Sequence, residues 1–374
     1  MKNLVIKRVE NRSDLLKFIR MVWKINQGDP NWVPPLLIDR LKVLDKEKNP
    51  FFKHSEAEYF LAMKDGEIVG RIAAITNQMH NDFHKDNTGF FGFLEGVNDP
   101  DVFKALLDTA RHWLKERGKD KMIGPMNPST NDEIGFLIKG FDSPPFLMMT
   151  HNPPYYQDIM EGLKYEKAKD LLAYYIHKDT IVIGEKLRQV ANLTKEKAGV
   201  KIRCINMEDF ETELDRVRKV YNDAWSKNWG FVPMTPEEFD FIAADFKRII
   251  DPRVVFIAEV KDEPIGFSLA LPDYNQVFAK IPNGKLFPTG WLKLLRLRKK
   301  INRLRVITLG AIQKYQQAGI GGLFYLETFE RGVENGYDSA EMSWVLEDNE
   351  LMNRAARLMG GDPYKTYRIY GTDL

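Results

Sequence analysis

An internal repeat most constrains the fold, because the two halves of this 374-residue chain carry the same parts in the same order. Residues 60–70 and 256–266 both read Phe-x-Ala followed eight residues later by Gly, in a predicted hairpin with an Asp-containing turn. Each hairpin follows a short apolar strand, a helical stretch and an aromatic, proline-containing loop, at 31–34 and 228–233. The repeat predicts a duplicated α/β (α+β) unit, each copy a mixed, mostly antiparallel sheet flanked by helices.

The repeat divides the chain into two predicted domains, residues 1–178 and 200–374, joined by a charged, helix-prone crossover at 179–199. The length suits two domains, and 44% hydrophobic with 29% charged residues is typical of a soluble folded protein. Lys and Arg number 55 against 53 acidic residues, so the net charge of +2 gives no reason to expect a nucleic-acid partner.

The cysteine, histidine and hydropathy patterns argue against disulfide-linked, metal-binding, secreted and membrane-spanning proteins. A single cysteine, Cys204, excludes an intrachain disulfide and a cysteine-rich metal site, as in proteins of reducing compartments. The six histidines lack ligand spacing such as His-Glu-x-x-His, so no metal site is predicted. The first residues are charged too early for a signal peptide, and no run of about 18 apolar residues occurs. We therefore expect a cytoplasmic protein.

A glycine-bracketed turn joins a strand predicted at 305–312 to a helix predicted at 323–332. Gly319 and Gly321 have no side chain that would block a ligand. The amides of residues 317–322 can therefore point at an oxygen-rich group from the start of the helix. The expected ligand is an anion such as a pyrophosphate.

Two linked motifs in this region resemble one family. Gln316, Gly319 and Gly321 form Q-x-x-G-x-G, which resembles the pyrophosphate motif of the GNAT N-acyltransferase superfamily. Residues 349–361 are similar in spacing to the family's N-x-x-A-x-x-L-Y-x-x-x-G-F segment, although glycine ends it in place of phenylalanine. The resemblance implies acyl-coenzyme A or acetyl-coenzyme A as co-substrate and no metal. Ala356 stands where the family has the tyrosine that protonates the leaving thiolate, which puts that step in question.

The resemblance also implies which residues hold the coenzyme. Main-chain groups of residues 310–312 would pair with the pantetheine arm, and Gly310 suits a β-bulge that separates this strand from the next. Asn349 would contact the coenzyme or cap the following helix. The implied coenzyme-binding residues are Gly310, Ala311, Ile312, Gln316, Gln317, Ala318, Gly319, Ile320, Gly321, Gly322 and Asn349. The first half has Asn98-Asp99-Pro100-Asp101 at the matching place and is not expected to bind coenzyme A.

Amide formation from a thioester requires a neutral amine, a polarised carbonyl and a route for the departing proton. Three carboxylates around the strand predicted at 337–345 are candidate bases, namely Glu341, Glu347 and Asp348. Glu347 and Asp348 can equally cap the helix that follows.

Two segments are candidates for the acceptor site. Residues 221–233 stand where the superfamily binds its acceptor, and their aromatic side chains favour an apolar amine or an ordinary core. Residues 124–156 are irregular and suit either part of an acceptor pocket or a proline-rich connection. The predicted substrate-binding residues are Trp225, Asn228, Trp229, Phe231, Asn275, His151 and Tyr155.

Residues 291–305 read as a basic amphipathic helix, with leucines on one side and lysines and arginines on the other. Such a helix can lie on an anionic membrane, which would place the protein peripherally at the inner membrane face. It can also dock on its own domain, or attract the 3′-phosphate of the coenzyme.

The whole chain resembles the double-GNAT family that includes bacterial ceramide synthase-like proteins, on residues 228–233, 272–276 and 344–349. That resemblance implies N-acylation of a long-chain, sphingoid-like amine from a fatty acyl-coenzyme A. Two alternatives stay open. One is a small-molecule acetyltransferase that uses acetyl-coenzyme A, and the other is a non-catalytic coenzyme A-binding or interaction protein.

Overall fold

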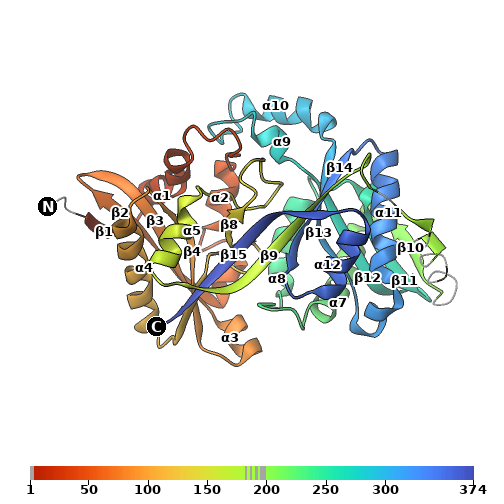
Figure 1. The fold of residues 1–374 in the computed structure, drawn as a ribbon, viewed down its shortest axis with the longest axis horizontal. Helices are drawn as coiled ribbons and strands as arrows, with labels where there is room; N and C mark the ends of the chain where they lie inside the picture. Colours follow the sequence, from red (N-terminus) through yellow and green to blue (C-terminus); the bar gives the residue numbers. More distant parts are fainter. Residues whose placement is uncertain (1–3, 182, 186–187, 190–192, 194–198) are drawn as a thin grey trace. The chain divides into compact units, whose positions relative to one another are not determined.

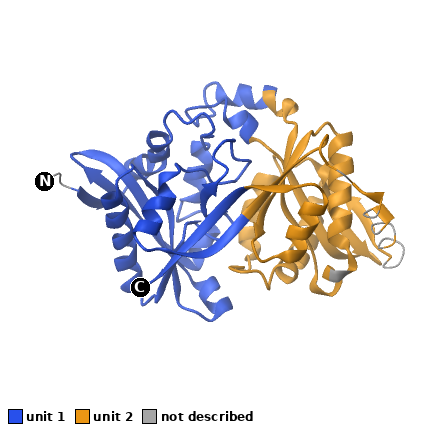
Figure 2. Cartoon of the chain, viewed as in Figure 1, with its two compact units in different colours: residues 1–171, 275–296, 365–374 blue, residues 172–274, 297–364 orange. Residues whose placement is uncertain are grey.

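The computed structural model describes residues 4–181, 183–185, 188–189, 193 and 199–374. The chain forms two compact units, which Figure 2 shows in different colours. Unit 1 comprises residues 1–171, 275–296 and 365–374, and unit 2 comprises residues 172–274 and 297–364.

The two units are interleaved along the chain, whereas the predicted domains are continuous segments. Strands β9 (Glu166–His177) and β15 (Asp362–Asp373) each run from one unit into the other, and residues 275–296 return to unit 1. Much of the crossover predicted at 179–199 lies outside the described residues.

Unit 1 is built on a mixed sheet with the strand order β1-β2-β3-β4-β5-β15 (Figure 1). Strands β4 and β5 are parallel, and the other neighbouring pairs in this order are antiparallel. Strand β8 also pairs with β15. The strands of unit 1 are β1 (Leu4–Arg8), β2 (Ser55–Lys64), β3 (Glu67–Asn77), β4 (Thr88–Gly96), β5 (Lys121–Gly124), β6 (Met126–Asn127), β7 (Glu133–Ile134) and β8 (Phe136–Lys139), together with parts of β9 and β15. Its helices are α1 (Arg12–Ile25), α2 (Leu37–Val43), the 3-10 helix η1 (Pro50–Lys53), α3 (Gln78–His84), α4 (Pro100–Lys115), α5 (Tyr155–Gly162), α9 (Asn275–Phe278) and α10 (Gly290–Leu297).

Helix α4 supplies one side of the unit 1 core, because its apolar residues recur at helical spacing and are buried against the sheet. The helix begins at an Asp99 cap, whose carboxylate accepts from the Asp101 amide and pairs with Lys64 at 2.6 Å. The start of α4 therefore already carries a carboxylate of the protein itself.

Unit 2 repeats this plan with the strand order β9-β14-β13-β12-β11-β10 (Figure 1). Strands β13 and β14 are parallel, and β10 to β13 are antiparallel. Its strands are β10 (Lys201–Cys204), β11 (Val255–Val260), β12 (Glu263–Pro272), β13 (Arg303–Ala311) and β14 (Ser339–Leu346). Its helices are α7 (Phe210–Ala224), α8 (Pro236–Phe246), α11 (Ile320–Glu334), α12 (Glu350–Leu358) and the 3-10 helices η2 (Met207–Asp209), η3 (Pro252–Val254), η4 (Arg298–Lys300) and η5 (Gln313–Ala318).

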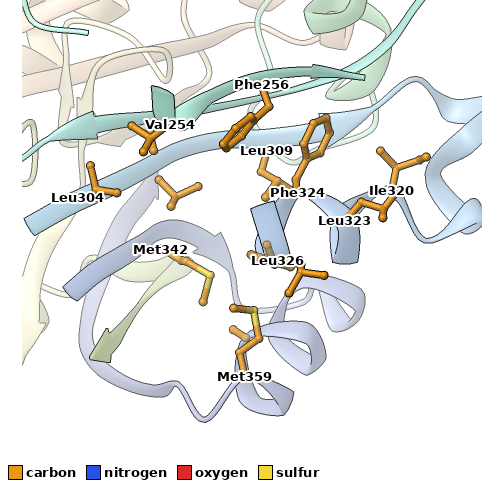
Figure 3. Close-up of a cluster of buried hydrophobic side chains, with 14 of the residues drawn as sticks. Val254, Phe256, Leu304, Leu309, Ile320, Leu323, Phe324, Leu326, Met342 and Met359 are labelled. Atoms are coloured by element: carbon orange, nitrogen blue, oxygen red, sulfur yellow. The ribbon is translucent and has the colours of Figure 1, made fainter. Parts of the chain in front are cut away.

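Helix α11 fixes the core of unit 2. Its buried side chains Ile320, Leu323 and Phe324 pack in one cluster with Phe256 of β11 and Leu309 of β13 (Figure 3). Because this cluster joins the first turn of α11 to the sheet, the start of the helix is held at a fixed place beside β13.

The predicted helix over 291–305 is wrong in its extent, because α10 ends at Leu297 and β13 begins at Arg303. Leu304 and Arg305 pair with Pro272 and Leu271 of β12 and are buried in the sheet. The second half of the predicted helix is therefore the 3-10 turn η4 and the first residues of a strand.

Candidate active site

Strands β13 and β14 separate partway along their length. Their paired residues run from Arg303 with Ser339 to Val306 with Met342, yet β13 continues to Ala311. Beyond Val306, no residue of β14 pairs with β13 in the described part of the chain. Backbone groups on that edge can therefore bind an extended ligand in the way an added strand does.

The β-bulge that accompanies this separation lies at Ile307. Leu269 of β12 pairs with Thr308 and Ala270 pairs with Val306, which leaves Ile307 as the extra residue. The prediction of a bulge at Gly310 is wrong, because Gly310 pairs regularly with Phe267. Gly310 is instead a site of close approach by an aromatic ring.

That ring belongs to Trp225, at the end of α7. A Cβ at Gly310 would lie 2.8 Å from Cζ2 of Trp225, so only glycine fits there without displacing the indole. The indole stacks on Tyr221 with a centroid distance of 5.1 Å and tilts against Phe267 at 5.3 Å. The predicted acceptor segment and the predicted coenzyme strand are thus in direct contact in unit 2.

The other residues of the acceptor segment divide between core and surface. Phe231 is buried, whereas Asn228 and Trp229 are half-buried. The backbone of Asn228 donates to the Trp225 carbonyl at 2.8 Å, which closes the turn after α7.

The start of α11 has the features expected of an anion site. Gly319 is its N-cap in the left-handed conformation, with φ of 81°, and has no side chain that could accept from the first amides of the helix. Around a Cβ built at Gly321, the nearest contact is Leu309 Cδ2 at 3.7 Å, so the space beside this residue is open. Ile320 between them is fully buried and anchors the turn.

The turn before α11 is tied to the end of α7 by side chains. The Gln316 amide, placed by the sequence among the pyrophosphate ligands, donates to the Ala224 carbonyl at 3.0 Å. The Gln313 backbone donates to Asp223 at 2.7 Å, and its side chain donates to Ser226 at 2.9 Å. Gln316 therefore positions the turn, while Ala318 and Gly322 are half-buried on it and the side chain of Gln317 lies outside what the structure describes.

A buried polar cluster occupies the point where β13 and β14 separate. Glu341 is fully buried and accepts hydrogen bonds from Ser343 Oγ at 2.6 Å and from the Tyr364 hydroxyl. Arg305, its register partner on β13, lies 4.0 Å from the same carboxylate and donates to Ser343 Oγ at 3.0 Å. Together these residues place a carboxylate, a guanidinium and a phenol one residue from the last paired position, Val306 with Met342.

The three carboxylates predicted as bases are therefore in different environments. Glu341 is inside the sheet, whereas Glu347 and Asp348 are exposed in the turn after β14. Neither Glu347 nor Asp348 caps α12, because Asn349 is the N-cap and accepts from the Met352 amide at 3.2 Å. The capping role considered for Asn349 is thus the one the structure shows.

Ala356 is fully buried in α12, so the missing family tyrosine leaves no phenol at that position. Tyr364 is half-buried and provides a phenol beside Glu341. Sequence reasoning missed Tyr364, Arg305 and Ser343, although a charged residue inside each of two apolar strands, Arg305 and Glu341, was the available signal.

The remaining predicted substrate residues lie in unit 1. His151 is paired with Asp29 at 2.7 Å, and burial lowers the pKa of this histidine although the carboxylate opposes the change. Tyr155 donates to the Gly96 carbonyl at 2.7 Å, and burial raises its pKa to about 12. Asn275 donates to the Pro145 carbonyl at 2.9 Å. These bonds fix the irregular stretch 124–156, and a role in substrate binding stays a prediction.

Within unit 1, the position equivalent to the unpaired edge of β13 is occupied by unit 1's own chain. The pairing of β4 with β5 also ends early, at Phe90 with Ile123. Beyond it, Asn127 Oδ1 accepts from the Phe93 amide at 2.6 Å, and a Cβ at Gly92 would lie 1.8 Å from the Met126 carbonyl oxygen. The edge equivalent to that of β13 is thus covered by the chain itself. Among the residues that the structure describes, an unpaired edge and a glycine helix start occur together in unit 2 and not in unit 1.

Among the described residues, no group of three or more His, Cys, Asp or Glu side chains lies close enough together to hold a metal ion.

The duplicated unit, the separating parallel strands and the glycine-capped helix define the fold of tandem GNAT proteins. The fold is similar to that of a tandem GNAT protein from the clavulanic acid biosynthesis pathway, with a TM-score of 0.57, 10% identity, and coverage of 99% of this chain and 98% of that one. A GCN5-related N-acetyltransferase from Sphaerobacter thermophilus gives a TM-score of 0.53 at 12% identity, covering 99% and 95%.

Sequence comparison identifies the family more closely. No protein-family model matches the chain. It is 37% identical over 369 residues to the bacterial ceramide synthase of Caulobacter vibrioides (strain NA1000 / CB15N), covering 97% of this chain and 95% of that protein. It is 38% identical over 366 residues to protein YghO of Escherichia coli (strain K12), covering 96% and 93%. The chain belongs to the bacterial ceramide synthase-like family and has the tandem GNAT fold.

Proposed function

We propose that the protein is an N-acyltransferase that transfers a fatty acyl group from acyl-coenzyme A to a long-chain, sphingoid-like primary amine. The observation that carries the proposal is the open edge of β13, which runs between the glycine start of α11 and the Arg305–Glu341–Tyr364 cluster. A relative that shares 37% of its residues over nearly the full length is named a bacterial ceramide synthase, which supports the substrate class.

The residues present fit coenzyme A. The amides at the start of α11 suit a pyrophosphate, because Gly319 offers no capping side chain and the space at Gly321 is open. The unpaired edge of β13 suits the amide-containing pantetheine arm. When bound there, the coenzyme supplies the thioester whose carbonyl the amine attacks.

Tyr364 carries out both proton transfers in the proposed reaction. Amide formation joins nitrogen to the carbonyl carbon, breaks the carbon–sulfur bond, and leaves a thiolate that takes up a proton. Tyr364 gives its hydroxyl proton to the sulfur, and the proton lost by the nitrogen restores the phenol. Glu341 is fully buried, so it acts as a positioning residue that orients the phenol rather than as a group that touches substrate.

The aromatic side chains beside Gly310 favour an acceptor with a long apolar part. Tyr221 and Trp225 are half-buried and form, together with the buried Phe267, an aromatic surface that contacts the β13 strand. Such a surface contributes apolar burial for an alkyl chain while the amine reaches the neighbouring strand.

Turnover of matched donors tests the proposal. Purified protein is incubated with acetyl- and palmitoyl-coenzyme A and a panel of amines from polyamines to long-chain amino alcohols, and products are identified by mass spectrometry. The proposal requires palmitoyl transfer to the long-chain amino alcohol. Transfer of acetyl groups to small amines alone would identify a small-molecule acetyltransferase. Coenzyme binding without turnover across the panel would identify a non-catalytic coenzyme A-binding protein.

A further inference from the structure

The segment that leads into α10 exposes large apolar side chains. Phe287 is 73% exposed, and Trp291, Leu292 and Leu295 on α10 are 40%, 45% and 47% exposed. Gly290 is the one buried residue of this helix. Helix α10 therefore does not use its leucines to build the core of unit 1, which is unusual for an apolar helix of a globular protein.

The same segment is strongly basic. The net charge of the whole chain is only +2, yet no Asp or Glu occurs from Tyr274 through Leu326. Basic residues gather in its first half and are all exposed, namely Lys280, Lys285, Lys293, Arg296, Arg298, Lys299 and Lys300. A positive surface without neutralising carboxylates in its own segment attracts anionic partners.

Apolar and basic side chains share the outer side of α10. At about 100° per residue, Trp291, Leu295 and Leu292 cover one arc, and Arg296 and Lys293 follow directly beside it. Leu294 and Leu297 are half-buried and occupy the inner arc. We call Lys285, Phe287, Trp291, Leu292, Lys293, Leu295 and Arg296 the α10 surface; all seven belong to unit 1.

The α10 surface is held on a folded support. Trp23 Nε1 donates to the Pro282 carbonyl at 2.7 Å, and the Leu37 amide donates to the Gly284 carbonyl at 2.9 Å. Gly284 has φ of 64°, and a Cβ there would lie 2.4 Å from the Pro35 carbonyl oxygen. Exposure of the apolar side chains is thus a property of a packed segment rather than of a loose loop.

We propose that the α10 surface binds an anionic lipid bilayer. Phenylalanine, tryptophan and leucine side chains bury in the headgroup boundary while adjacent lysines and arginines pair with lipid phosphates. No helix in the described part of the chain is long and apolar enough to cross a membrane, so binding occurs at the surface. The sequence prediction placed this contact over residues 291–305. Because Leu304 and Arg305 are buried, the proposed contact comprises residues 285–296 instead.

Vesicle co-sedimentation tests the proposal with the full chain. Vesicles of pure phosphatidylcholine are compared with vesicles of equal parts phosphatidylcholine and phosphatidylglycerol. Wild type is expected to sediment with the anionic vesicles and to be released by high salt, because salt screens the basic residues. Phe287→Ser with Leu295→Ser, and Lys285→Glu with Arg296→Glu, should each weaken binding by more than about tenfold.

Matched controls separate the α10 surface from general effects. Phe83→Ser with Val333→Ser alters exposed apolar residues elsewhere, and Lys115→Glu with Lys219→Glu makes the same change of charge elsewhere. Both controls should bind like wild type. Equal binding by all variants, or sedimentation with neither kind of vesicle, overturns the proposal. A concentration-dependent dimer in analytical ultracentrifugation that Phe287→Ser with Leu295→Ser dissociates would also overturn it, by assigning the surface to a second copy of the chain.

Discussion

Gly321 provides a sharp test of the coenzyme site, because substitutions there should change stability and coenzyme binding separately. Alanine should stabilise the fold, whereas glutamate should weaken coenzyme binding. Gly321 is the second residue of α11, and a Cβ there has only Leu309 Cδ2 as a neighbour, at 3.7 Å. Gly321→Ala should therefore leave the fold intact and stabilise the helix by about 0.5 kcal/mol, seen as a small rise in Tm. Gly319→Ala should instead destabilise by about 1–2 kcal/mol, because φ at Gly319 is 81°.

Gly321→Glu adds a negative charge where the pyrophosphate is expected. A carboxylate about 5 Å from one phosphate charge costs about 3 kcal/mol at an effective dielectric constant of about 20. Affinity for coenzyme A in isothermal titration calorimetry should therefore fall by more than about a hundredfold. Gly162→Glu is the matched control, because a Cβ at this helical glycine of unit 1 meets nothing within 4 Å and a glutamate can be accommodated there as at Gly321. Unchanged affinity in a folded Gly321→Glu protein would refute the assignment of the site.

Four further predictions concern the residues around this site and the two cores. Gly310→Ala puts a methyl carbon 2.8 Å from Trp225 Cζ2, so the indole should shift and stability should fall by about 1–3 kcal/mol in urea unfolding. Tyr364→Phe removes the donor to Glu341, so kcat should fall by about a hundredfold or more with the coenzyme Kd unchanged in calorimetry; loss of affinity without loss of kcat would argue against proton transfer. Leu323→Ala should cost about 2–5 kcal/mol, because the side chain is fully buried. Burial lowers the pKa of His151 in the folded state, so folding favours the neutral imidazole. The stability that this preference contributes is complete above about pH 6.5 and is lost as the pH falls through the folded-state pKa. His151→Gln should therefore make the free energy of unfolding fall less steeply on the acid side.

Features set by neighbouring residues were predictable from the sequence. The strand predicted at 305–312 is β13 at Arg303–Ala311, and the helix predicted at 323–332 lies within α11 at Ile320–Glu334. Both follow from local patterns, since alternation and helical spacing need only a short window. The left-handed Gly319 was predictable for the same reason, because glycine is the residue that adopts this conformation at little cost.

Features set by strand register were not predictable. Arg305 and Glu341 meet only because β13 and β14 pair in one particular register, and Tyr364 reaches Glu341 from a third strand. Nothing within a short window fixes such a register. The bulge at Ile307 and the end of α10 at Leu297 depend on the same pairing of distant residues, which explains why Gly310 and residues 298–305 were assigned incorrectly.

The comparison of the two units explains why a duplicated fold holds a single candidate coenzyme site. In unit 1 the helix start is capped by Asp99, and the strand edge beyond Phe90 is covered by Met126 and Asn127. In unit 2 a glycine replaces the capping carboxylate, and among the described residues β14 does not pair with β13 beyond Val306. Removing the Asp99 carboxylate would free only the helix amides, while the Met126 carbonyl would still lie against Gly92. Conversion of unit 1 into a coenzyme site therefore requires displacement of a chain segment, so point substitution of Asp99 should not create binding.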